Sequence, residues 1–166
     1  MTSTPLPTTA LPTTKALRDL LLDLLGRDVE VAPTEPYAPE ADERATSAVY
    51  VDDSMHTSAV MVADLPFSAY AGAAIGLVPV GGAKAAIEDR ELAPTVRDNL
   101  YEVLNICASL LNGEGRPHVK LHTMYEPGAW PPADVSAYAK ALGRRLDLTV
   151  DIAGYGSGRL SIVVVG

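Results

Sequence analysis

The stretch from Ala93 to Asn112 carries the clearest hydrophobic pattern in the sequence. Its apolar residues recur every three or four positions, as on the buried face of an amphipathic helix, and Pro94 falls in the first turn, where a helix tolerates proline. The apolar positions are Val96, Leu100, Val103, Leu104, Cys107, Leu110 and Leu111. The opposite edge is a narrow polar line of Asp98, Glu102, Asn105, Ser109 and Asn112, flanked by Tyr101 and Ile106. The pattern predicts a long helix with an unusually thin polar edge.

This polar edge has two interpretations. Many helices simply cover a core and expose a few short polar side chains. A solvated face of that kind is usually wide and rich in Lys, Arg and Glu, whereas this line carries only two charges, Asp98 and Glu102, both near its start. The second interpretation is a docking ridge that presents a carboxylate and an amide to a partner.

The rest of the chain alternates between helical and extended patterns. Helical periodicity predicts helices at residues 14–25, 65–77 and 133–142, and a short helical piece at 83–92. Alternating or β-branched runs predict strands at residues 28–32, 47–52, 57–64, 119–125, 146–152 and 160–165. Breaks are predicted at 33–44, 53–56, 78–82, 113–117 and 154–158. Because hairpins join most neighbouring strands, we predict an α+β fold, with a largely antiparallel sheet of about six strands and long helices packed on one face.

Composition and charge narrow the class of protein. At 166 residues, of which 48% are hydrophobic, the chain can bury the core of one domain. The net charge of −8 argues against a nucleic-acid partner and fits a cytoplasmic protein that meets other proteins. No apolar run is long enough to span a membrane. Residues 1–13 are rich in Pro and Thr and resemble no secretory signal, so we expect a disordered tail at 1–13 and a single domain at 14–166.

Several weaker motifs do not indicate a site. His118 and His122 lie on a predicted strand, where their spacing separates them by about 13 Å, which favours a solvated face over a metal site. The run from Gly81 to Lys84 lacks the spacing of a phosphate-binding loop. The single cysteine, Cys107, lies on the apolar face of the central helix and is expected to be a buried, inert thiol. We therefore expect no metal site and no cofactor of the protein's own.

The remaining chemistry lies on the polar edge of the central helix. A carboxylate such as Glu102 can pair with a lysine of a partner and fix its orientation. A carboxamide such as Asn105 can donate a hydrogen bond to a water molecule and accept one from it, which places the water in line with a phosphorus atom. Phosphoryl transfer needs mainly positioning and electrostatic stabilisation, and a neutral amide orients the attacking water in GTPases.

These residues resemble the motif of the CheC/CheX/FliY family of chemotaxis phosphatases. Asp98, Glu102 and Asn105 have the spacing of that motif, and Pro127 follows after 21 intervening residues. The sequence EVLNICASLLN is similar to the family's helix, which often has a small residue four positions after the Asn, here Ser109. The predicted order of elements before the motif is also similar, and a single motif at this length resembles CheX more than CheC.

The resemblance implies a CheX-like domain that hydrolyses the aspartyl phosphate of a CheY-like response regulator. Glu102 would pair with a regulator lysine, and Asn105 would orient the attacking water. Asp98, Tyr101 and Ser109 would support the motif or contact the partner, and Pro127 would shape the neighbouring loop. The Mg²⁺ would belong to the regulator, and dimerisation through the sheet is implied.

Two other functions remain open from the sequence. One is a non-enzymatic interaction module that uses the same ridge, or the sheet edge, to bind a signalling protein, in which case Asn105 would be dispensable. The other is a small-ligand-binding α+β domain, which would need a concave pocket.

Overall fold

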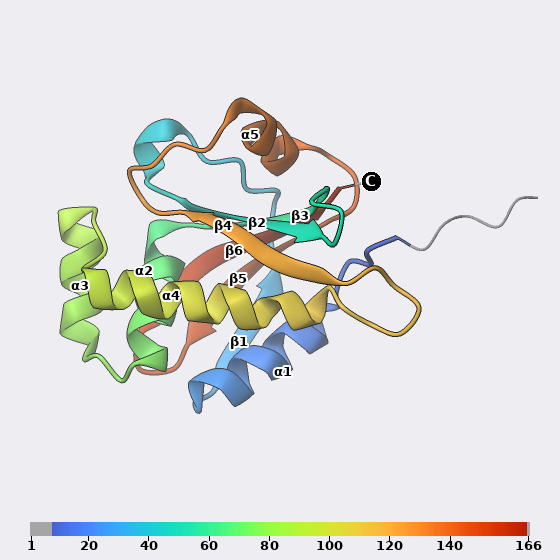
Figure 1. Cartoon of the computed structure of the whole chain (residues 1–166). Helices are drawn as coiled ribbons and strands as arrows, with labels where there is room; N and C mark the ends of the chain where they lie inside the picture. Colours follow the sequence, from blue (N-terminus) through green and yellow to red (C-terminus); the bar gives the residue numbers. More distant parts are fainter. Residues whose placement is uncertain (1–7, 166) are drawn as a thin grey trace, which may run out of the picture.

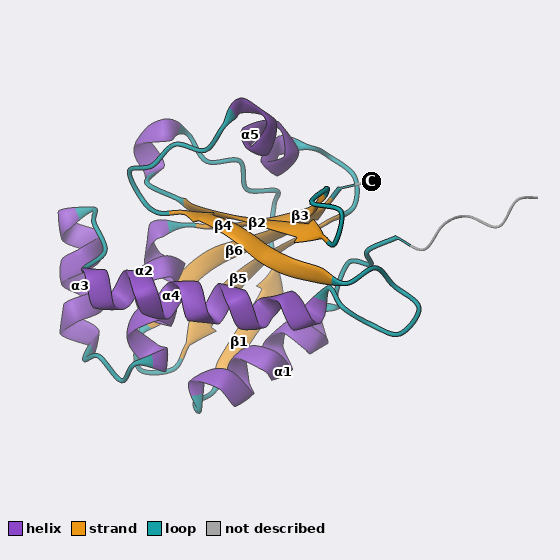
Figure 2. Ribbon diagram, in the orientation of Figure 1, coloured by secondary structure: helices purple, strands orange, loops and turns teal. Residues whose placement is uncertain are grey.

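The computed structural model describes residues 8–165 and shows one six-stranded sheet with helices on both faces (Figures 1 and 2). The helices are α1 (Thr14–Leu25), α2 (Leu65–Ile75), α3 (Val80–Asp89), α4 (Pro94–Cys107) and α5 (Ala133–Lys140). The strands are β1 (Val29–Pro33), β2 (Thr46–Asp52), β3 (Thr57–Ala63), β4 (Val119–Tyr125), β5 (Arg145–Ile152) and β6 (Gly156–Val164). The sheet order is β1-β5-β6-β3-β2-β4, and every neighbouring pair is antiparallel. The predicted α+β fold with an antiparallel sheet is confirmed.

The prediction that all the helices pack on one face of the sheet is wrong. α1, α2 and α4 lie on one face of the sheet, and α5 lies on the other (Figure 1). The central strands are apolar on both sides: Ala48 and Tyr50 belong to the core under the three helices, and Val49 and Val51 belong to a second cluster with Val135 of α5. Since both faces of β2 and β3 are apolar, each face of the sheet must be covered by helices.

The last hairpin has a shorter turn than predicted. β6 begins at Gly156, so residues 156–158 extend the strand, although glycine is unfavourable there. Gly158 is required by packing, because a Cβ at this position would lie 2.3 Å from the backbone nitrogen of Phe67, at the start of α2. That contact joins residues far apart in the sequence, which is why local pattern did not reveal it.

Helix α3 was predicted to start later than it does. The predicted break at 78–82 is wrong in part, because the helix begins at Val80 and includes Gly81 and Gly82. Pro79 precedes it as the N-cap residue, and the N–H of Gly82 donates to the Pro79 carbonyl at 2.9 Å. Because glycine and proline are also typical of loops, their presence at the start of this helix led to the wrong prediction of a loop.

Close contact with α2 sets the position of α4. A Cβ at Gly72 would lie 2.6 Å from the Val96 carbonyl oxygen, so glycine permits the two helix backbones to approach. The Asn99 amide donates to the Gly72 carbonyl at 3.0 Å. The apolar face of α4 is buried as predicted, with Val96, Leu100, Val103, Leu104 and Cys107 inside, while Leu110 is partly exposed. The helix is thus held on its inner side with a fixed rotation about its axis.

The chain makes contacts before residue 14. Of the predicted tail, residues 1–7 lie outside the described residues. Thr9 is buried, and its carbonyl accepts a hydrogen bond from Arg144 Nη2 at 2.6 Å. Contacts with the body of the domain therefore begin upstream of α1. Between residues 8 and 165, no helix has the length and apolar character needed to span a membrane.

Candidate functional site

The outer edge of α4 presents four of the five residues in the predicted polar line. The side chains of Asp98, Glu102, Asn105 and Ser109 are exposed. They lie three or four positions apart, so they follow one line along the helix, and Asp98 and Asn105 are separated by about 10 Å of helical rise. The helix geometry therefore brings the predicted Asp, Glu and Asn together on one exposed edge.

The fifth residue, Asn112, does not belong to this edge. The α-helix ends at Cys107 and continues as a short 3₁₀ helix, Ala108–Leu110, rather than running to Asn112 as predicted. The Asn112 amide donates to the Val119 carbonyl at 2.8 Å and accepts from the Val119 N–H at 2.7 Å. Asn112 therefore holds the start of β4 against the end of the helix.

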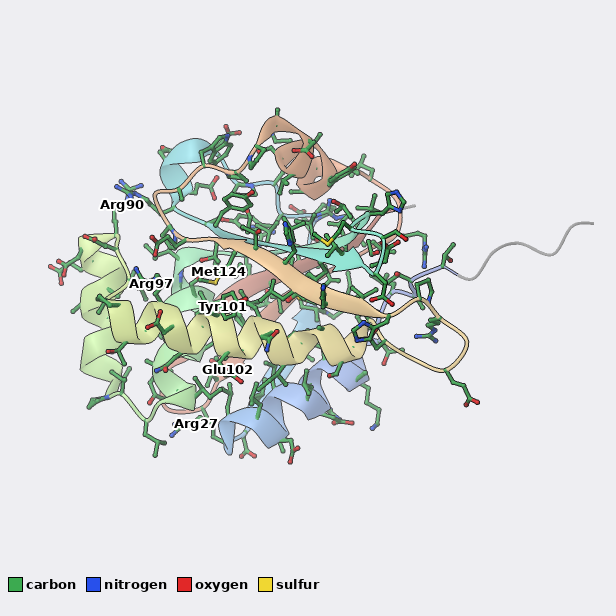
Figure 3. All side chains as sticks on the ribbon, viewed as in Figure 1. Arg27, Arg90, Arg97, Tyr101, Glu102 and Met124 are labelled. Carbon is green, nitrogen blue, oxygen red and sulfur yellow. The ribbon has the colours of Figure 1, made fainter. Side chains whose placement is uncertain are left out.

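The side chains of Glu102 and Asn105 have no hydrogen bond or ion pair to any residue in the range 8–165. Both side chains are exposed, and each stands on a helical turn whose inner residues are buried. A carboxylate and an amide on a fixed backbone, with no intramolecular partner within the described residues, can bind a partner without first breaking a bond. In Figure 3, Glu102 is labelled on the side of α4 that faces away from β4.

A buried hydrogen bond fixes the end of the helix that carries Asn105. The N–H of Ala108 bonds to the Asn105 and Ile106 carbonyls, so the helix tightens where the 3₁₀ turn begins. The Leu104 carbonyl accepts a hydrogen bond from the hydroxyl of Tyr50 on β2 at 2.5 Å, and Tyr50 is fully buried.

Burial raises the pKa of the Cys107 thiol to about 12, so this thiol stays protonated and is not a nucleophile.

A groove of 390 Å³ lies beside the first half of the edge, between α4 and the end of β4. Its lining includes Arg97, Asp98, Tyr101, Met124 and Glu126. Figure 3 shows Arg97, Tyr101 and Met124 gathered where α4 passes β4. The sequence identified Asp98 and Tyr101 but missed the other three, because their proximity depends on how β4 pairs with β2 and not on any local pattern.

Pro127 stands in a tight turn at one end of this groove. The N–H of Ala129 donates to the Glu126 carbonyl at 2.9 Å, and Gly128 has φ 96°. Proline followed by a residue with positive φ is the pattern of a type II turn. Glu126 and Ala129 line the groove while Pro127 is buried. The structure therefore brings the Pro127 turn to the Asp98 end of the helix edge.

The weaker motifs form no site. His118 is exposed just before β4 and His122 is exposed on it, and His118 Nδ1 lies 3.3 Å from the exposed Asp53 carboxylate. In the part of the chain that the structure describes, no group of three or more His, Cys, Asp or Glu residues could hold a metal ion. Gly81 lies in the first turn of α3 and not in a phosphate-binding loop.

Known proteins with this fold were identified by structure, while no family model and no curated protein matches the sequence. FliM from Helicobacter pylori, in its complex with SpeE, matches with a TM-score of 0.57 and 10% identity over 90% of this chain and 80% of that one. FliY from Thermotoga maritima matches with a TM-score of 0.56 and 12% identity over 89% and 82% of the two chains. CheX from Borrelia burgdorferi, in a complex with CheY, BeF₃ and Mg²⁺, matches with a TM-score of 0.51 and 9% identity over 92% and 94%. At these identities the likeness concerns the fold.

Proposed function

The chain has the fold of the CheC/CheX/FliY family, and on this premise we propose that it is a phosphatase for the aspartyl phosphate of a CheY-like response regulator. One observation carries the proposal. Glu102 and Asn105 are exposed, have no partner among the described residues, and stand on adjacent turns of a helix whose inner face is buried. The partner class is supported by the CheX of the same fold that was crystallised with CheY. Action on such a regulator would place the protein in the cytoplasm.

Each residue has a distinct role in this mechanism. The Glu102 carboxylate pairs with a lysine beside the phosphoaspartate and fixes the regulator in register. The Asn105 amide enters the phosphorylation site and holds a water molecule in line with phosphorus. The water oxygen bonds to phosphorus, the bond from phosphorus to the aspartate oxygen breaks, and the products are the free carboxylate and inorganic phosphate. Mg²⁺ is held by the regulator and neutralises charge on the phosphoryl oxygens.

The test is release of inorganic phosphate from purified CheY-like receiver domains phosphorylated with acetyl phosphate. Wild-type protein should accelerate release, and Asn105→Ala should reduce that acceleration by about a hundredfold, because the water loses its orienting group. Glu102→Ala should raise the concentration needed for half-maximal rate by about tenfold, because a charged contact to the partner is lost. Glu114→Ala, in the exposed loop after the helix, is the control and should behave as wild type. Unchanged phosphate release with wild-type protein would contradict the proposal for that regulator.

The alternative is a binding module of the same fold. FliM shares the fold and was crystallised with another protein, SpeE. A module of this kind would bind the receiver domain equally well with and without the phosphoryl group, and Asn105→Ala would change nothing. The cavity between α5 and the loop at Pro39 measures 20 Å³ and has room for about one water molecule, so this cavity offers no site for a small ligand.

A further inference from the structure

We propose that the groove between α4 and the end of β4 takes a lysine or arginine side chain of the regulator from outside its phosphorylation site, and so selects among regulators. This inference rests on the proposed function, because it concerns a second contact of the same docked partner. The groove shares Asp98 with the helix edge, and Tyr101, which flanks that edge, also lines the groove. A regulator seated on Glu102 and Asn105 would therefore cover it.

The charge of the groove favours a cation. Two carboxylates line it, those of Asp98 and Glu126, against one guanidinium, that of Arg97. Arg97 Nε lies 3.5 Å from Asp98 Oδ1, and Arg97 Nη1 lies 3.5 Å from Glu126 Oε2. These contacts are long for charge-assisted hydrogen bonds, and the two carboxylate side chains are 75% and 44% exposed, so both can accept further donors. The lining thus carries a net charge of one negative unit.

The apolar part of the groove fits the stem of a basic side chain. Tyr101 is 41% exposed, and Met124 is partly exposed on the facing strand. Lys and Arg bury their methylene stems on apolar surface while the charged head remains at a polar rim. The Tyr101 ring also offers a face to a cation. A lysine or arginine therefore matches both the floor and the rim of this groove.

Two variants with opposite charge changes test the proposal. Arg97→Gln and Glu126→Gln both remove the Arg97–Glu126 ion pair, and Arg97→Gln also removes the contact with Asp98; a structural effect of losing the shared pair has the same sign in both variants. A change in the attraction for a bound cation has opposite signs in the two variants, because one variant removes a positive charge and the other a negative charge. The measurement is the Kd for a CheY-like receiver domain loaded with beryllium fluoride and Mg²⁺, at low ionic strength. We expect Glu126→Gln to raise the Kd and Arg97→Gln to lower it, each by about threefold to tenfold.

The controls separate this groove from the catalytic proposal. Glu30→Gln, on the exposed side of β1 at the other edge of the sheet, makes the same charge change and should leave the Kd unchanged. Added salt should shrink both groove effects. Kd changes of the same sign, no change, or tighter binding only of Glu126→Gln would each overturn the proposal. If the Kd values diverge as expected while wild type does not accelerate phosphate release, the groove stands and the phosphatase proposal falls. If wild type binds no receiver domain, both fall.

Discussion

Replacing Tyr50 with phenylalanine would remove the buried hydroxyl that holds the Asn105 end of α4. Phenylalanine keeps the ring and its packing, so the change isolates the hydrogen bond from Tyr50 to the Leu104 carbonyl. This carbonyl lies in the last turn of α4, where the N–H of Ala108 bonds to the Asn105 and Ile106 carbonyls. The variant therefore leaves a buried acceptor without its partner, which costs about 1–3 kcal/mol.

This cost predicts a measurable loss of stability. A loss of about 2 kcal/mol should lower the urea midpoint by roughly 1 M and the melting temperature by about 4–8 °C in a chain of this size. Urea titration followed by circular dichroism measures the midpoint. Amide hydrogen exchange should also quicken around Leu104 and Asn105, because the helix end opens more easily.

The matched control is Tyr101→Phe. It removes the same atom from the same residue type on a half-exposed side chain, and we expect a change of less than about 0.5 kcal/mol. Equal midpoints for Tyr50→Phe and Tyr101→Phe would refute the reasoning. If the phosphatase proposal holds, Tyr50→Phe should slow phosphate release less than Asn105→Ala, since the amide remains but is held less firmly.

Two further predictions concern the scaffold. Gly72→Ala should destabilise the protein by about 1–3 kcal/mol, because the new Cβ would lie 2.6 Å from the Val96 carbonyl oxygen. Urea titration measures this loss. An unfolding midpoint at or above that of wild type would contradict the close approach of α2 and α4. Burial opposes ionisation of the Asp147 carboxyl and would raise its pKa. Hydrogen bonds from Arg145, Ser161 and the Tyr37 backbone N–H outweigh this effect and hold the pKa below its usual range. Its contribution to stability is therefore present near neutral pH and is lost as pH falls below about 4 through its lowered folded-state pKa. Asp147→Asn should cost about 3 kcal/mol at neutral pH, because it leaves the buried Arg145 uncompensated, and its stability should fall less steeply in acid; an equally steep acid limb would contradict the assignment.

Features set by neighbouring residues were predictable from the sequence. α1 spans Thr14–Leu25 as predicted, because its ends are set locally: the Thr13 hydroxyl caps the first turn, and Gly26 ends the helix with φ 65°. The outward line of Asp98, Glu102 and Asn105 follows from 3.6 residues per turn once the apolar face is buried. The antiparallel sheet followed from short connections between alternating runs.

Only the tertiary structure decided the features that join distant segments. The hydroxyl of Tyr50 reaches the Leu104 carbonyl of α4 from strand β2, and the Asn112 amide bonds to the start of β4 beyond the end of that helix. The groove exists because β4 pairs with β2 and thereby brings Glu126 to within 3.5 Å of Arg97, 29 residues away in the chain. Hydrophobic periodicity indicates which face of its own helix or strand a side chain occupies. It carries no information on which residues of other elements pack against that face. The sequence by itself therefore determined the catalytic edge that we propose, and the fold determined the groove beside it.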